Sequence, residues 1–339
     1  MKGRVVALGH MGDAEAAALI EDGQLVDFLT ETDQPRPGTI YHAIADRPVK
    51  GQGGMFVKTP DGPGFLRQVK GLAPGQGLLV QVTGYAEPGK AIPVTQRVLF
   101  KSRYAIVTPQ APGVNVSRAI RDDDRRDALT VVGKSQMQGT EAGLILRSSC
   151  VEAEDEAIAE DIAQMVQMAQ AVISDEAGAR AEKLLEGDGP HDLAWRDWPE
   201  PDLWGAAPDG FVDHGVADLL DDFMQMHVPL LSGAGLYVEP TRALVAVDVN
   251  TGHDTSPSAG AKANIAAAQA LPRQLRVRGL GGQIVLDLAP MPKRDRRQFE
   301  TVLRAAFRKD SVETTLVGWT PLGHYELQRK RDRLPLKGH

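Results

Sequence analysis

The sequence predicts an α/β protein that includes a small β-barrel. Three observations predict it: apolar runs separated by Gly and Pro fill residues 38–110, strand-like runs alternate with helical patterns over 235–319, and a hairpin pattern opens the chain. Short strands with frequent turn signals are typical of small barrels. Strands that alternate with helical segments are typical of α/β sheets. The chain therefore combines two kinds of architecture.

The first 34 residues predict antiparallel strands. Residues 3–9 and 16–30 are rich in apolar side chains, and Asp22-Gly23 interrupts the second run. Asp-Gly between apolar runs is a strong hairpin signal, because both residues accept the backbone angles that a tight turn requires. We therefore expect a hairpin that turns at this dipeptide.

The Gly- and Pro-rich stretch that follows predicts the barrel. Its short apolar runs are GTIYHAI, GGMFVKT, GFLRQV, GLLVQVT and RYAIVTP. Each run has the length of a strand and is bounded by turn residues. We expect all of them to be barrel strands.

The middle of the chain is less regular. Residues 112–150 are mixed and end in a predicted strand over 143–149, and residues 152–186 predict a long acidic helix. Ile158, Ile162 and Ala169 follow the spacing of one helix face. The connector 187–215 holds three tryptophans that could stack RNA bases or simply pin the loop to a core; these are Trp195, Trp198 and Trp204.

The last third predicts alternating strands and helices. Residues 235–252 predict a hairpin that turns near Pro240-Thr241, and residues 259–278 predict a helix. A strand over 283–289, a helix over 293–309 and a strand over 313–319 follow, ahead of a basic tail. The apolar positions of the second helix lie on one face, which suits packing against a sheet.

Composition excludes several classes of protein. The net charge of -7 is unevenly spread: residues 273–339 carry 15 Lys/Arg against 7 Asp/Glu, whereas residues 151–222 carry 3 against 20. The basic end is either a phosphate-binding face or a solvated helix surface. Cys150 is the only cysteine, which excludes a disulfide framework and a cysteine-rich zinc site within one chain. No apolar run is long enough to span a membrane, so a cytoplasmic protein with no membrane partner is expected.

Two aspartates predict a metal site. Asp248 ends the apolar run ALVAV and Asp287 ends the run IVL, so each carboxylate lies near the end of a strand. Two such groups brought together would repel unless a cation lay between them, and magnesium favours carboxylates together with substrate phosphates. Asn250 would lie on the same strand face as Asp248. The alternative is that each aspartate only caps a turn.

A basic helix beside these aspartates favours the metal interpretation. Its cations are Lys293, Arg294, Arg296 and Arg297. A cation site beside clustered guanidinium groups suits phosphodiester chemistry.

Three sets of motifs resemble the ribonuclease E/G family. VAVDVNTG (245–252), RQLRVRGLGGQIVLDLAPM (273–291) and PLGHYELQRKR (321–331) resemble its catalytic region. GTIYHA, GGMFVKTPDGPGFL and GQGLLVQVT, within residues 38–83, resemble its S1-type OB-fold, and GLILRSS (143–149) resembles its phosphate-sensing segment. The two aspartate motifs, in this order and separation, are the most specific part of the match.

The resemblance implies a ribonuclease H-like mixed sheet with an inserted S1-type OB-fold β-barrel. The first hairpin would then share one sheet with residues 235–319. The implied domains are the hairpin at 1–34, the OB-fold at 35–110, the sensor-like segment at 111–150, the acidic helix and connector at 151–230, and the catalytic region with its basic tail at 231–339.

The resemblance also implies roles for single residues. Asp248 and Asp287 would bind Mg²⁺, and Asn250 would complete the catalytic group. Phe56 and Phe65 would stack bases of single-stranded RNA beside Lys90, although either phenylalanine could instead belong to the barrel core. Further implied contacts are Arg147 and Ser148 with the RNA 5′-monophosphate, and Arg294 and Arg297 with the backbone.

Several departures from the family pattern qualify these roles. Ser148 replaces a threonine, and Glu313 lies where the sensor pocket has an arginine, so its carboxylate would repel a 5′ phosphate. Pro290 replaces a common acid, and Pro272 predicts a kink or a fresh start in its helix. Residues 152–230 are shorter than the family's nuclease-I-like subdomain. The cysteine pair of the zinc link is missing, so no zinc-linked dimer is expected and any homo-oligomer is expected to be weak.

The function expected is magnesium-dependent hydrolysis of single-stranded RNA by an endoribonuclease of RNA processing or decay. The main alternative is a non-catalytic RNA-binding protein that keeps the scaffold. A nuclease that acts on DNA and an assembly protein that uses its acidic helix are further alternatives.

Overall fold

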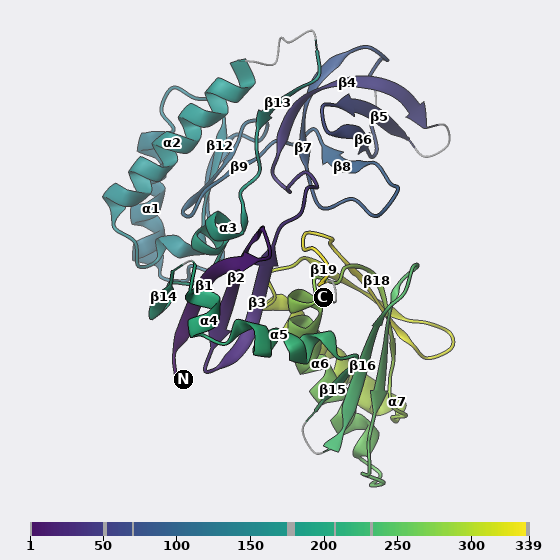
Figure 1. Cartoon of the computed structure of the whole chain (residues 1–339). Coiled ribbons are helices and arrows are strands. Elements are labelled where there is room, and N and C mark those ends of the chain that lie inside the picture. Colours follow the sequence, from purple (N-terminus) through teal and green to yellow (C-terminus); the bar gives the residue numbers. More distant parts are fainter. Residues whose placement is uncertain are drawn as a thin grey trace. The chain divides into compact units, whose positions relative to one another are not determined.

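The computed structural model divides the chain into two compact units, drawn in Figure 1. One, called the split unit here, joins Met1–Thr32 to Pro201–His339, and the other, the continuous unit, is Asp33–Glu200. The structure describes residues 2–49, 53–69, 71–174, 180–206, 208–230 and 233–336. None of the helices in these ranges is both long and apolar enough to cross a bilayer.

A closed β-barrel occupies one part of the continuous unit. Its strands are β4 (Ile40–Val49), β5 (Gly54–Thr59), β6 (Gly62–Leu66), β7 (Gly77–Val82) and β8 (Ile92–Thr95). They pair in the order β4-β5-β6-β8-β7, and β7 also pairs with β4, which closes the barrel. Alternate side chains such as Met55, Val57 and Leu66 fill its interior. The predicted small barrel is confirmed, and its closure is consistent with an OB-like fold.

The continuous unit also contains a separate sheet and two longer helices. The strands are β9 (Phe100–Lys101), β10 (Ala105–Thr108), β11 (Gly113–Val116) and β12 (Gly143–Leu146), and the helices are α1 (Asp123–Gln136) and α2 (Asp155–Ser174). Strand β10 was expected in the barrel, but it pairs with β9 and β12. Its Ala105 and Val107 share a core with Ile158 and Ile162 of α2, which accounts for its place here.

The local sequence explains where α1 begins. The Asp122 side chain accepts a hydrogen bond from the backbone N–H of Arg125 at 2.7 Å and so caps the helix. Helix α1 was not expected from the sequence. The acidic helix expected over residues 152–186 does not reach residue 186, because β13 (Glu182–Leu185) pairs with β4. Two short helices complete this unit: η1 (Ser148–Cys150) and α3 (Pro190–Asp197).

The first hairpin lies in a sheet of its own within the split unit. The strand order is β14 (Leu203–Gly205), β1 (Arg4–Met11), β2 (Ala14–Glu21) and β3 (Gln24–Thr30). Asp22 and Gly23 have φ angles of 49° and 78°, as the predicted turn requires. Helices α4 (Gly210–Asp213) and α5 (Val216–Met224) follow, and α5 contributes Val216, Leu220 and Phe223 to the core of this sheet.

The last third of the chain forms a second sheet in the split unit. Its order is β15 (His227–Pro229), β16 (Gly235–Pro240), β17 (Val245–Asn250), β18 (Gly282–Asp287), β20 (Tyr325–Arg329) and β19 (Thr314–Trp319). Strands β17 and β18 are parallel, whereas the other pairs are antiparallel. Helices α6 (Ala259–Val277) and α7 (Lys293–Arg308) cover one face, as Figure 1 shows.

Two expectations for this region are wrong, and the fresh start that Pro272 allowed does not occur. The first hairpin does not share this sheet; it packs instead on helix α6, whose Val277 lies in the hairpin's core. Helix α6 continues through Pro272 as one element. Part of the expected basic tail is strand β20, because its Tyr325 and Leu327 are buried in the core.

A buried ion cluster fixes the hairpin to the second sheet within the split unit. Arg276 and Arg329 both donate to the carboxylate of Asp310, whose side chain is fully buried. Arg276 also donates to the carbonyl of Val26 in β3 at 2.7 Å. A carboxylate between two buried guanidinium groups is costly to remove, because both cations lose their counter-charge.

We predict that Asp310→Ala lowers the free energy of unfolding by about 3–5 kcal/mol, the range for breaking a buried ion pair. Urea denaturation followed by circular dichroism measures the change. The control is Asp295→Ala. Its ion-pair partner Arg294 is 85% exposed, with Nε 3.6 Å from Asp295 Oδ1. Loss of this exposed pair should lower the free energy of unfolding by at most about 1 kcal/mol. Equal losses in the two variants would contradict the role of the cluster.

Candidate functional site

Asp248 and Asp287 are direct neighbours on adjacent parallel strands. The register of β17 and β18 pairs Val245 with Ile284 and ends with Asp248 opposite Asp287. Residues paired across a sheet lie on the same face, and adjacent strands are about 4.8 Å apart. The register therefore brings together two carboxylates that are far apart in the sequence.

The alternation of each strand places both carboxylates on the open face of this sheet. In β17, Val245, Val247 and Val249 are buried against the helices, whereas Asp248 and Asn250 are exposed. In β18, Ile284 and Leu286 are buried and Asp287 is exposed. Both carboxylates therefore face solvent, which can screen part of their repulsion.

In the part of the chain that the structure describes, each carboxylate makes one polar contact with a nearby amide or imidazole. The Asn250 amide donates to Asp248 Oδ2 at 2.7 Å, and His324 Nδ1 lies 3.3 Å from Asp287 Oδ1. Among the described residues, no backbone N–H donates to either carboxylate. The turn-capping interpretation of the two aspartates therefore finds no support.

The donor set fits a hard divalent cation that is bound in part by substrate. Over the described ranges, no group of three or more His, Cys, Asp and Glu side chains could hold a metal ion. Magnesium commonly takes one or two carboxylates and completes its shell with water and phosphate oxygens. The Asp248–Asp287 pair supplies that number of carboxylates.

The predicted basic residues follow the second aspartate on helix α7. Arg294 is 85% exposed, with its Nε 3.6 Å from Asp295, and Arg297 is also exposed. Arg296 is held more firmly, with its guanidinium 4.1 Å from the centre of the Trp319 ring. The helix thus carries exposed cations in the split unit that also carries the aspartates.

Phe56 and Phe65 pair on the outside of the barrel. They are opposite each other on β5 and β6, with ring centroids 5.3 Å apart and Arg47 5.1 Å from the Phe56 ring. Their neighbours Met55 and Leu66 point inward instead. The barrel-core alternative is wrong for both phenylalanines. Lys90 is 65% exposed and pairs with Glu87 at 2.8 Å.

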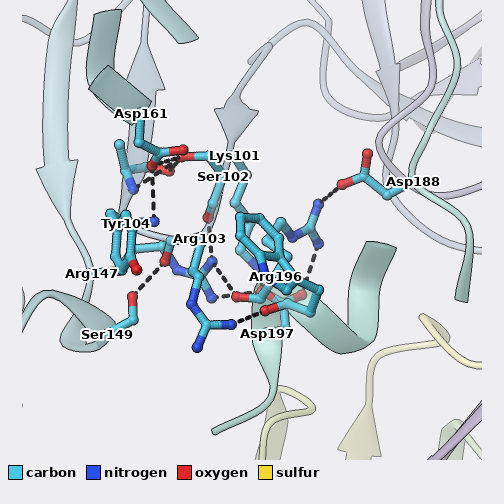
Figure 2. A network of polar contacts seen from close by, with 12 residues as sticks. Lys101, Ser102, Arg103, Tyr104, Arg147, Ser149, Asp161, Asp188, Arg196 and Asp197 are labelled. Atoms are coloured by element: carbon cyan, nitrogen blue, oxygen red, sulfur yellow. Dashed lines mark hydrogen bonds and ion pairs between the residues drawn. The ribbon is translucent and has the colours of Figure 1, made fainter. Parts of the chain in front are cut away.

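Arg147 is engaged inside the continuous unit, as Figure 2 shows. Its Nη2 donates to Asp197 Oδ1 at 2.6 Å, and its Nη1 donates to the carbonyl groups of Ser102 and Arg196. Asp197 is also paired with Lys101 and Arg196, each at 2.8 Å. The guanidinium expected to receive a terminal phosphate is therefore already bound to a carboxylate.

Electrostatics keep this network charged. Burial alone would raise the pKa of Asp197, but Arg196, Lys101 and Arg147 lower that pKa far below its usual range. Burial lowers the pKa of Lys101, and Asp197 offsets part of that change. Ser148 is exposed at the start of η1, so of the expected phosphate pair only the serine is open to solvent.

Two ring side chains beside the aspartates were not expected from the sequence. Tyr237 is opposite Asp248 on β16, and His227 is opposite Tyr237 on β15. The hairpin pairing of Pro240 with Val245 fixes the partner of Asp248, so the predicted turn could have located Tyr237. His324 lies within the motif PLGHYELQRKR, but the motif alone gives it no role, because its approach to Asp287 depends on the pairing of β18 with β20.

Comparison with known proteins identifies the family. The family model described as Ribonuclease E/G family matches residues 100–203 and 202–332. Similar proteins include Ribonuclease E of Nostoc sp. (strain PCC 7120), 27% identical over 94% of this chain and 54% of that protein. Ribonuclease G of Salmonella typhimurium is 29% identical and that of Escherichia coli K12 is 28% identical, each over 76% of this chain and 60% of the relative.

The chain spans little more than half the length of these relatives. The matched ranges nevertheless cover most of this sequence and include both aspartate motifs. The chain belongs to the ribonuclease E/G family.

Proposed function

We propose that this chain is a magnesium-dependent endoribonuclease that hydrolyses single-stranded RNA in RNA processing or decay. The register pairing of Asp248 with Asp287 carries the proposal, because it brings two exposed carboxylates together on one face. The relatives named Ribonuclease E and Ribonuclease G support the choice of RNA as substrate.

Asp248 and Asp287 would hold the cation. Magnesium bound there would neutralise charge on the scissile phosphate and make water a better nucleophile. Asn250 holds Oδ2 of Asp248 at 2.7 Å and so fixes the orientation of that carboxylate. His324 Nδ1 lies 3.3 Å from Oδ1 of Asp287 and limits the rotation of that carboxylate in the same way. The chain's own contribution is thus to keep two like charges in place before RNA arrives.

The β-barrel of the continuous unit would bind the unpaired RNA strand. Phe56 and Phe65 present adjacent rings on its outer face, and Arg47 lies over one of them. Stacking on aromatic rings requires bases that are not paired in a duplex, which favours single-stranded RNA. Exposed Lys90 would hold a phosphate in place of Glu87, and Arg294 and Arg297 would contact the RNA backbone in the split unit.

The second candidate function is binding of RNA without cleavage. The pairing of Arg147 with Asp197 favours it, because recognition of the RNA 5′-monophosphate by that arginine would require a free guanidinium. The exposed aspartate pair favours cleavage, since binding alone does not need two adjacent carboxylates that repel phosphate.

We predict that Asp248→Asn and Asp287→Asn each lower the rate of RNA cleavage by more than about 100-fold, since changing a residue that only orients a metal ligand already costs about 10- to 100-fold. RNA affinity should persist. Single-turnover assays on single-stranded RNA, with magnesium and with chelator, measure the rate.

The matched control is Glu326→Gln. Glu326 is a carboxylate on the same sheet, opposite Val285, which lies two residues before Asp287. This variant should cleave as the unaltered chain does. If the unaltered chain binds RNA but gives no cleavage with magnesium, the binding-only function holds instead.

We predict that RNAs with a 5′-monophosphate and a 5′-hydroxyl are cleaved at the same rate. The reason is that Arg147 is bound to Asp197 and two carbonyl groups. Parallel time courses on two RNAs that differ only at the 5′ end make the comparison. A clear preference for the monophosphate would mean that the ion pair opens for substrate.

A further inference from the structure

A row of polar and aromatic side chains crosses the open face of the second sheet. Register places His227 opposite Tyr237, Tyr237 opposite Asp248 and Asp248 opposite Asp287 on successive strands. All of these side chains are exposed, whereas the residues that flank them along each strand include core residues such as Leu236 and Val247. The two rings therefore continue the line that the two carboxylates begin.

The two rings form a platform that the core does not require. Tyr237 is 38% exposed, and its ring centroid lies 4.9 Å from that of His227 at an angle of 47°. Neither ring belongs to the hydrophobic core on the opposite face. Their outer surfaces remain available to a flat partner.

Gly235 makes room for the imidazole. A Cβ atom at this position would lie only 2.5 Å from Nε2 of His227. Gly235 is itself the register partner of Asn250. The ring of His227 thus lies close to Gly235, the neighbour of Asn250, while Tyr237 is the neighbour of Asp248. The two rings are therefore next to both residues of β17 in the proposed catalytic group.

We propose that Tyr237 and His227 form a stacking subsite for the nucleobase that flanks the scissile phosphate. This inference rests on the proposed function, because it takes the phosphate to lie at Asp248 and Asp287. Neighbouring side chains on paired strands have Cβ atoms about 5 Å apart, so a base attached to that phosphate's nucleotide reaches the tyrosine ring. Stacking on a ring accepts every base, so the subsite adds affinity and position without a sequence preference.

A cycle of paired changes in the protein and the RNA tests this contact. One RNA carries all its bases, and a second has an abasic site next to the cleaved bond. Base stacking is worth about 1–3 kcal/mol, so removal of that base should lower kcat/KM of the unaltered chain by about 5- to 150-fold. Tyr237→Ala should lose as much on the complete RNA and show little further loss on the abasic RNA.

Matched variants separate stacking from packing. Tyr237→Phe keeps the ring and should have the kcat/KM of the unaltered chain. Tyr237→Leu keeps an apolar side chain without a ring and should lose as much kcat/KM as Tyr237→Ala. His227→Ala should give a partial loss. Val317→Ala, at an exposed apolar position of the same sheet, should change nothing. Circular dichroism checks that each variant is folded.

A binding version of the cycle separates this inference from the proposed function. In Asp287→Asn protein, an RNA with 2-aminopurine at successive positions should show quenching that Tyr237→Leu removes. If RNA is bound with this quenching but the unaltered chain never cleaves, the subsite stands and the nuclease proposal fails. If cleavage occurs and the losses from Tyr237→Ala and the abasic site simply add, the subsite is overturned. If no RNA is bound, both proposals fail.

Discussion

The parallel register of β17 and β18 is the constraint on which the site depends. It places Asp248 beside Asp287, although these two like charges would separate if their backbones were free. The alignment is maintained from the opposite face, where Val247 and Leu286 are buried against helices α6 and α7. A slip of one residue would bury one carboxylate and expose an apolar side chain, so the hydrophobic core fixes the charged pair.

Local patterns in the sequence predicted the elements well, but not their partners. The turn at Asp22-Gly23 and the helix over 293–309 follow from short-range signals and were found. Strand β10 and the first hairpin were assigned to the wrong sheets, because a strand's alternation shows which face is buried and not which strand lies beside it. Strand β20 was missed because its end runs into the basic segment over residues 328–333, although its Tyr325 and Leu327 are buried.

In the candidate site, too, the sequence predicted single residues better than their partners. Asp248 and Asp287 could be named from their places at strand ends, and Phe56 and Phe65 from the family resemblance. The ion pair of Arg147 with Asp197 could not be predicted, because its residues come from segments 50 positions apart that meet only in the folded unit. A motif thus identifies a residue type at a position, whereas the fold decides which partner that residue binds.

The most direct test of this account is a titration with Mn²⁺ followed by electron paramagnetic resonance, since manganese favours the same oxygen ligands as magnesium. The unaltered chain should bind one ion, Asp248→Asn and Asp287→Asn should each lose that ion, and Glu326→Gln should retain it. Unchanged binding of Mn²⁺ in both aspartate variants would contradict the claim that these two carboxylates form the metal site.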